Sequence, residues 1–155
     1  MEPHATDLLD PARLATLAID ALERTAFVLA DPADRPDALP AAEIGAEIRF
    51  HGSADGSVSL RASRAFGRNL AASLLGCGPE EIVDAQADEA LRELANIVGG
   101  SVVSLLGGDD CRISLGLPAT VAADGPDGLA GARTDCVLDA EGERLEIRCV
   151  RSVAA

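Results

Sequence analysis

Lysine, tyrosine and tryptophan are absent from this chain of 155 residues, which contains three phenylalanines and two histidines. Without lysine, the chain has neither a Schiff-base nucleophile nor the lysine of a phosphate-binding loop. Without tyrosine or tryptophan, it has no aromatic platform on which single-stranded nucleic acid could stack. The histidines, His4 and His51, are too few for a metal site built from several histidines of one chain.

Positive charge is also scarce, because 13 arginines face 26 acidic residues and the formal net charge is −13 at pH 7. Such a charge repels nucleic-acid phosphates and anionic lipid, so we expect neither nucleic acid nor membrane as a partner. No apolar run reaches the roughly 18–20 residues that span a bilayer. The first residues also lack the basic end and apolar stretch of a signal peptide. We therefore expect a cytoplasmic protein.

The spacing of the cysteines also suits a cytoplasmic protein, because the chain contains no Cys-x-x-Cys pair. Two of the cysteines stand in alternating apolar patterns, where cysteine behaves as a small hydrophobic residue. We expect all four to be reduced thiols, and we expect no metal or other cofactor bound by this chain. They are Cys77, Cys111, Cys136 and Cys149.

The composition that remains is that of a folded protein, with 48% hydrophobic and 25% charged residues. Its length suits one domain, which we place at residues 10–151 between short tails at 1–9 and 152–155. Helical periodicity and caps predict helices from Asp10-Pro11 to about Ala30, over 64–75 and over 84–106. Alternation predicts strands at 44–51, 57–61, 111–121, 134–139 and 144–151, with loops at 31–37 and 123–133.

A faint internal repeat supports a fold class. Residues 22–28 can be laid on residues 92–98, and each copy is a long helix followed by antiparallel strands. Two such halves that share one sheet predict an α+β domain with a pseudo-twofold helix-strand-strand repeat. Its antiparallel sheet has long helices packed on one apolar face.

The third predicted helix carries a polar stripe. With about 100° per residue from Glu89, Glu93 falls at about 40° and Asn96 at about 340°. The apolar residues Leu91, Leu94, Val98, Val102 and Leu105 cluster on the opposite side. If these face the core, the three polar residues face water on a rigid element.

Two glycines, Gly99 and Gly100, follow inside this helix. Each costs about 1 kcal/mol relative to alanine in a helix interior. We expect close approach to account for them, either by the first helix or by the backbone of a partner next to Asn96. The residues alone go no further, because an exposed Glu and Asn are most often ordinary solvated side chains.

Residues 89–100 read Glu-Ala-Leu-Arg-Glu-Leu-Ala-Asn-Ile-Val-Gly-Gly, which resembles the signature helix of the CheC/CheX/FliY family of chemotaxis phosphatases. That motif is an acidic residue or serine, three residues, Glu, two residues and Asn, with glycine soon after. Glu89 stands where the motif usually has Asp or Ser; it is one methylene longer than Asp and keeps the charge. The first helix has Glu23 but Ala26 in place of a second Asn, so the chain resembles CheX-like members with one site.

The resemblance implies a phosphatase that hydrolyses the aspartyl phosphate of a CheY-like response regulator. Asn96 would orient the attacking water, Glu93 would pair with a lysine of the regulator, and Glu89 and Gly100 would contact the partner. Mg²⁺ would be bound by the phosphorylated partner. CheX-like relatives can dimerise, and an antiparallel sheet offers edge strands for a homodimer.

Two other classes of function stay open. One is a non-catalytic module of the same fold that docks on a receiver domain, a histidine-kinase assembly or a flagellar-switch protein. The other is a structural domain whose polar stripe is merely solvated. A measurement of phosphate release from phosphorylated receivers distinguishes the docking module from a phosphatase. Absence of receiver binding would favour the structural domain.

Overall fold

The computed structural model describes residues 9–107, 112–125 and 130–152. Its helices are α2 (Pro11–Ala26), α3 (Arg64–Leu75) and α4 (Asp84–Gly107), with short 3-10 helices η1 (Pro36–Ala38) and η2 (Pro79–Glu81). Its strands are β1 (Asp31–Pro32), β2 (Ile44–Gly52), β3 (Gly56–Ala62), β4 (Ile113–Leu115), β5 (Ala119–Val121), β6 (Ala132–Ala140) and β7 (Glu143–Arg151).

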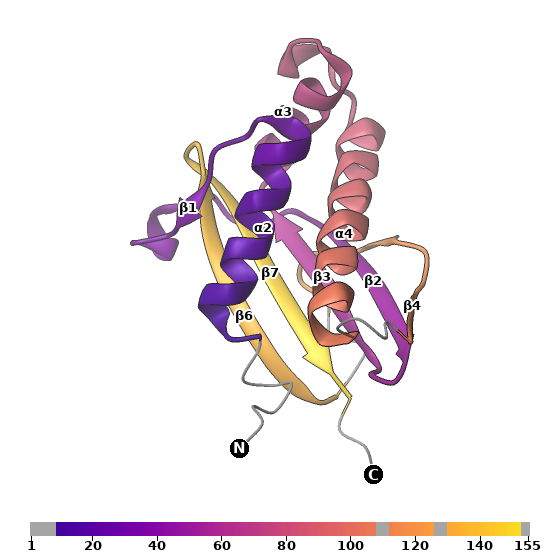
Figure 1. The fold of residues 1–155 in the computed structure, drawn as a ribbon. Coiled ribbons are helices and arrows are strands. Elements are labelled where there is room, and N and C mark those ends of the chain that lie inside the picture. Colours follow the sequence, from indigo (N-terminus) through magenta and orange to yellow (C-terminus); the bar gives the residue numbers. More distant parts are fainter. Residues whose placement is uncertain (1–8, 108–111, 126–129, 153–155) are drawn as a thin grey trace.

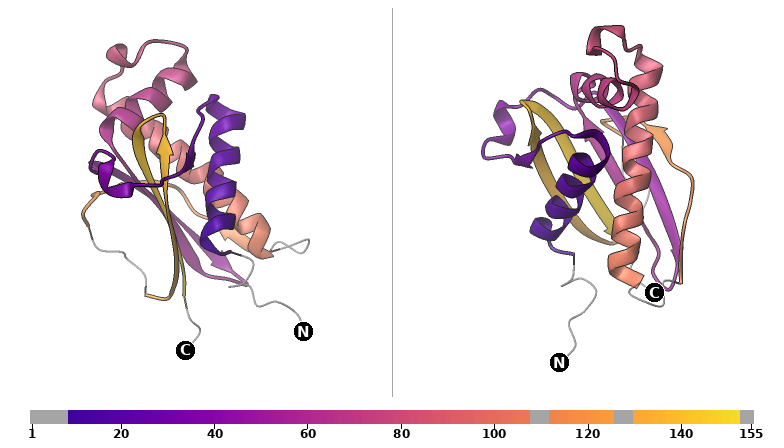
Figure 2. Two further views of the ribbon diagram at one scale, coloured as in Figure 1. Left: turned by 90° about the vertical axis from the view of Figure 1, so that its left-hand side faces the viewer. Right: turned by 45° about the horizontal axis from the view of Figure 1, so that its top comes forward.

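The strands form one antiparallel sheet in the order β1-β6-β7-β3-β2-β4, with β5 also paired to β2. The long helices α2 and α4 lie side by side on one face of this sheet, and α3 lies near one end (Figures 1 and 2). The core fills the space between helices and sheet. This arrangement confirms the predicted α+β class with helices on one apolar face.

The two predicted halves are visible in the strand order. The hairpins β2–β3 and β6–β7 lie next to each other through the β3–β7 pair at the centre of the sheet. Each helix packs mainly on the hairpin of the other half: α4 on β2 and β3, and α2 on β6. The β6–β7 turn has positive φ at Glu141 (56°) and Gly142 (89°), which suits a tight two-residue hairpin turn.

The first helix begins as predicted and ends earlier. The Asp10 side chain accepts a hydrogen bond from the backbone N–H of Arg13 (2.7 Å), and Pro11 occupies the first turn. The helix ends at Ala26 rather than near Ala30, because Phe27 adopts a left-handed conformation with φ 56°. Thr25, which helical spacing from Leu14, Ala18 and Ala21 would place on the buried side of this helix, is exposed.

The segment 111–121, predicted as one strand, is two short strands in its described part. β4 pairs with the end of β2 and β5 pairs with its beginning, and Gly116, Leu117 and Pro118 stand between them. Proline has no N–H to donate and its φ is fixed, which breaks the ladder at that point. Cys111 and part of the predicted loop 123–133 lie outside the described residues.

By length and composition, α4 is apolar enough to cross a membrane, with a mean hydropathy of 1.2 over its best window. In this fold, 44% of that window is buried inside the protein. The buried residues include Leu91, Leu94, Val98 and Val102, which were predicted to face the core. The hydropathy of α4 therefore reflects its place as a core helix.

The three described cysteines are free and differ in accessibility, which predicts the order of their modification. Burial raises the pKa of the Cys136 and Cys149 thiols to about 12, whereas Cys77 is exposed. Because the thiolate is the reactive form, we expect iodoacetamide at pH 8 to alkylate Cys77 in the native protein and to spare Cys149 until the chain unfolds. Peptide mapping by mass spectrometry checks this, and rapid native alkylation of Cys149 would contradict it.

Candidate functional site

The rotation of α4 on the sheet is set by its close contact at Gly99. A Cβ at this position would lie 2.8 Å from Cγ2 of Ile48 on β2 and 3.3 Å from Cδ1 of Leu115 on β4. At Gly99 the close approach is therefore made by the sheet and not by the first helix, which was one of the two neighbours expected for this glycine pair. Approach by the backbone of a partner next to Asn96, the other one, stays a prediction. Both strands lie beneath α4 because α4 packs mainly on β2, and β4 pairs with β2. Sequence spacing does not reveal this packing.

With that side held on the sheet, the predicted polar stripe faces outward. Glu89, Glu93 and Asn96 are all exposed. Gly100 lies about one turn beyond Asn96 on the same stripe, and a Cβ there would meet no described atom within 4 Å. Glu93 and Asn96 are separated by about 4.5 Å along the helix axis. A carboxylate and a carboxamide are thus presented together on one rigid element.

The carboxylates of this stripe are free to meet an outside partner. Among the described residues, neither Glu89 nor Glu93 forms a hydrogen bond or an ion pair through its side chain. Arg92 is the one cationic side chain in α4. It turns to the sheet and donates from Nη1 to Oγ1 of Thr120 on β5 (2.5 Å). The one positive charge that α4 itself carries is therefore engaged with β5 rather than with Glu89 or Glu93.

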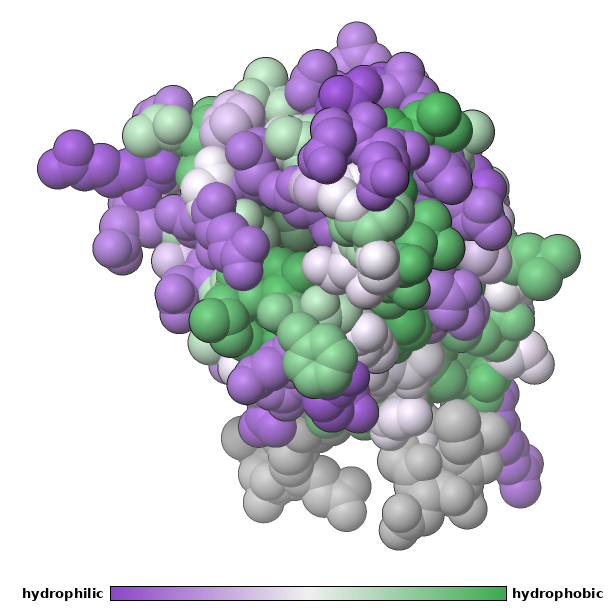
Figure 3. Space-filling model, turned by 90° about the horizontal axis from the view of Figure 1, so that it is seen from above, coloured by the Kyte–Doolittle hydropathy of each residue, from purple (hydrophilic) through white to green (hydrophobic). Residues whose placement is uncertain are grey.

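A groove borders the stripe between α3 and α4. It has a volume of about 230 Å³ and is lined by Ala71, Leu74 and Leu75 from α3 and by Gln86, Glu89, Ala90 and Glu93 from α4. Figure 3 looks down on this end of the molecule and shows apolar side chains reaching the surface among polar ones. Sequence reasoning did not find the two leucines, because which helix faces α4 is decided by tertiary packing.

A family model described as "Chemotaxis phosphatase CheX" matches residues 44–138, more than half of the chain, and includes the whole stripe. The chain belongs to the CheX family. No curated protein matches this CheX-family chain by sequence.

Solved structures share the fold of this CheX-family protein. CheX from Vibrio vulnificus has a TM-score of 0.76 at 15% identity, covering 97% of this chain and 100% of that one. A CheC-like superfamily protein from Shewanella sp. PV-4 has a TM-score of 0.74 at 18% identity, covering 99% and 100%. CheX in a CheX–CheY–BeF₃–Mg²⁺ complex from Borrelia burgdorferi has a TM-score of 0.66 at 14% identity, covering 93% and 99%.

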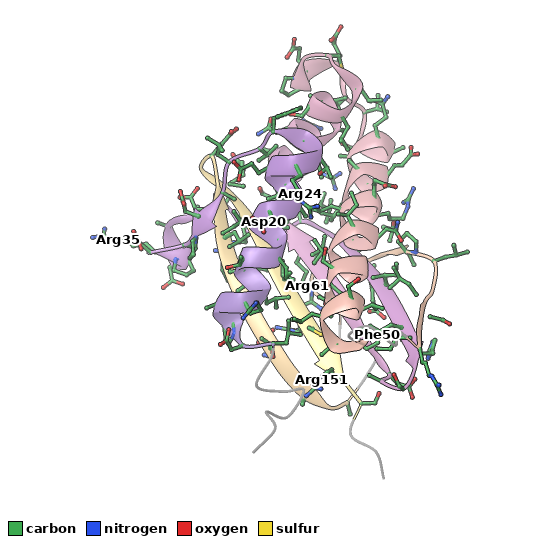
Figure 4. All side chains as sticks on the ribbon, viewed as in Figure 1. Asp20, Arg24, Arg35, Phe50, Arg61 and Arg151 are labelled. Carbon is green, nitrogen blue, oxygen red and sulfur yellow. The ribbon has the colours of Figure 1, made fainter. Side chains whose placement is uncertain are left out.

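The first helix of this CheX-family protein does not offer a second stripe of the same kind. Glu23 is exposed, but Ala26 is only 2% exposed and is the last residue of α2. A side chain at that position points into the core rather than toward a partner. The outward side of α2 instead carries Asp20 and Arg24, whose positions Figure 4 shows. The predicted site on α4 has no counterpart here.

Metal-binding side chains do not gather in the parts of the chain that the structure describes. Within residues 9–107, 112–125 and 130–152, no group of three or more His, Cys, Asp or Glu is placed to hold a metal ion. The donor set of the stripe is two carboxylates and an amide on one helix face. This set can orient water, accept from a cation and donate to an oxyanion.

Proposed function

We propose that this protein hydrolyses the aspartyl phosphate of a CheY-like response regulator in the cytoplasm. The observation that carries the proposal is the outward, unpaired placement of Glu93 beside Asn96 on α4. Membership of a family of chemotaxis phosphatases supports it. So does the Borrelia relative, a CheX found in complex with CheY.

In the proposed reaction, Asn96 positions one water in line with the phosphorus. Its carbonyl oxygen accepts a hydrogen bond from the water, and its NH₂ group donates to a phosphoryl oxygen. The water oxygen forms a bond to phosphorus while the bond from phosphorus to the aspartyl oxygen breaks. The products are a free carboxylate on the regulator and inorganic phosphate as H₂PO₄⁻, which carries both protons of the attacking water. Such loose transition states need positioning more than a strong base.

The other residues of the stripe hold the partner. Glu93 accepts from a lysine of the regulator and sets the docking register, and Glu89 is a second contact. Gly100 leaves open space beside Asn96, where the backbone of the regulator can approach. These roles depend on the same outward face of α4.

The partner supplies the parts that this chain lacks. The regulator brings the phosphoryl group, its own Mg²⁺ and its own lysine, while this chain contains no lysine. This division lets a protein without a basic catalytic residue accelerate phosphoryl transfer. Because the chain carries a net charge of −13, recognition relies on local contacts rather than on long-range attraction to an acidic regulator.

The testing experiment measures phosphate release from CheY-like receivers of the same organism, each phosphorylated with acetyl phosphate and Mg²⁺. We expect the protein to accelerate release from at least one receiver at substoichiometric concentration. Binding to a phosphorylated receiver without acceleration would instead identify a docking module. Absence of both binding and acceleration across the receivers would identify a structural domain.

Replacing Glu93 with alanine is expected to weaken docking. The variant loses one charge-assisted contact, so we expect the Kd for the phosphorylated receiver to rise roughly tenfold, as for loss of a hydrogen bond to a charged group. Isothermal titration calorimetry measures this. Glu23→Ala, which removes an exposed glutamate from α2, is the matched control and is expected to bind normally. Equal affinity of the Glu93 and Glu23 variants would exclude the proposed ion pair.

A further inference from the structure

The groove between α3 and α4 is an exposed feature whose α3 wall the proposed hydrolysis does not use. Its α3 wall is apolar, and Leu74 and Leu75 keep 42% and 59% of their surface exposed. Its α4 wall carries Glu89 and Glu93. A volume of about 230 Å³ is below the roughly 300–1,000 Å³ of small-molecule pockets. The groove suits a protruding side chain of another protein better than a metabolite.

The groove is preformed, because α3 and α4 are fixed to each other at two points. The carboxylate of Asp84, at the start of α4, forms ion pairs with Arg68 (N···O 3.0 Å) and Arg64 (N···O 3.4 Å) of α3. The hydrogen bond from Arg68 lowers the pKa of that carboxyl group. At Gly67 the helices approach so closely that a Cβ would lie 3.2 Å from Cβ of Ala87. The exposed leucines therefore stand on a rigid wall.

The groove is continuous with the site on α4. Glu93 belongs to both, and Gln86 at the far end of the groove lies about 15 Å from Asn96 along the helix axis. A standard interface covers about 800 Å² on each partner, equivalent to a patch roughly 16 Å in radius. A receiver that places its aspartyl phosphate over Asn96 therefore extends over the groove.

We propose that this groove is a specificity-determining contact with the same receiver. It takes an aliphatic side chain between Leu74 and Leu75, and a neighbouring lysine or arginine of the receiver meets Glu89. The inference rests on the proposed function for the identity of the partner. The chemistry of the walls sets what is recognised, namely an apolar residue beside a basic one. Receivers without that pair on the facing surface dock poorly.

The test compares a Leu74→Ala/Leu75→Ala double variant with Leu29→Ala, which truncates a leucine that is 65% exposed and lies after α2. Leu74 and Leu75 touch no reacting atom, so we expect KM for the phosphorylated receiver to rise roughly tenfold while kcat stays at its original value. Leu29→Ala is expected to change neither. A thermal unfolding midpoint near that of the original protein verifies that the double variant folds.

A second measurement separates this inference from the proposed function. Titration of the phosphorylated receiver into Asn96→Ala protein, with and without the two leucine substitutions, reports docking without turnover. A tenfold weaker Kd supports the groove contact even if no receiver is hydrolysed. Unchanged KM and Kd, with Asn96→Ala still inactive, would overturn the groove contact and leave the phosphatase intact. If the two leucine substitutions instead abolish self-association of this chain, as measured by sedimentation, the groove is a contact with a second copy. That result would also overturn the proposed receiver contact.

Discussion

Replacing Asn96 with alanine is expected to reduce phosphate release to the rate of the receiver alone. Alanine can neither hold the water in line nor donate to a phosphoryl oxygen. Loss of one preorganised group of this kind costs roughly 100- to 1000-fold in kcat. Continuous detection of inorganic phosphate measures the change. Asn96 is exposed on α4, so the substitution leaves the core untouched and folding is expected to be normal.

The control for this prediction is docking. The Asn96→Ala variant keeps Glu89, Glu93 and the groove, so we expect its Kd for the phosphorylated receiver to stay within severalfold of the original. Asn96→Asp is expected to be equally inactive, because its negative charge faces the phosphoryl oxygens. Turnover at the original rate in Asn96→Ala would remove this residue from the mechanism.

The largest expected loss of stability comes from Gly99→Val, which introduces side-chain atoms where α4 contacts the sheet. Even a Cβ would lie 2.8 Å from the Cγ2 methyl group of Ile48. Because isoleucine is branched at Cβ, this side chain cannot rotate away freely. Overpacking of this kind costs about 1–3 kcal/mol, so we expect the thermal midpoint to fall by roughly 2–12 °C. Because Gly99 sets the rotation of α4, turnover is expected to fall as well.

Its neighbour provides a matched control in the same helix. Gly100 has open space where a Cβ would stand, so Gly100→Ala is expected to raise the free energy of unfolding by about 0.5–1 kcal/mol through helix propensity. If the backbone of the receiver approaches there, the same variant binds the receiver severalfold more weakly. Chemical denaturation and calorimetry measure the two effects. A Gly99→Val protein as stable as Gly100→Ala would refute the packing argument.

Local rules predicted the ends of several elements correctly. The predicted strands at 44–51 and 57–61 pair as a hairpin, those at 134–139 and 144–151 pair as another, and α3 spans Arg64–Leu75 as predicted. These succeed because period-2 alternation, caps and turn residues act within a few residues of one another. The errors arise at two positions. α2 ends at Phe27, which adopts a left-handed conformation although it is not glycine. The ladder with β2 is interrupted at Gly116–Pro118, so that β4 and β5 are separate strands.

Other sequence-based expectations stay predictions: the domain limits at 10–151, the homodimer, the absence of a cofactor and the roles of the stripe residues. The edges of the sheet are formed by β1 on one side and by β4 and β5 on the other. An open stretch of edge strand is a surface that a second copy could extend.

The order of residues along α4 is enough to place Glu89, Glu93 and Asn96 on one face of a helix, because a 3.6-residue period depends on nothing beyond the helix. The same periodicity makes the opposite face apolar. Packing of the whole domain is needed to place that apolar face on β2 and β4 at Gly99 and to bring the last turn of α3 beside the carboxylates. Those contacts join residues far apart in the chain, and their geometry depends on how the two halves of the sheet pack.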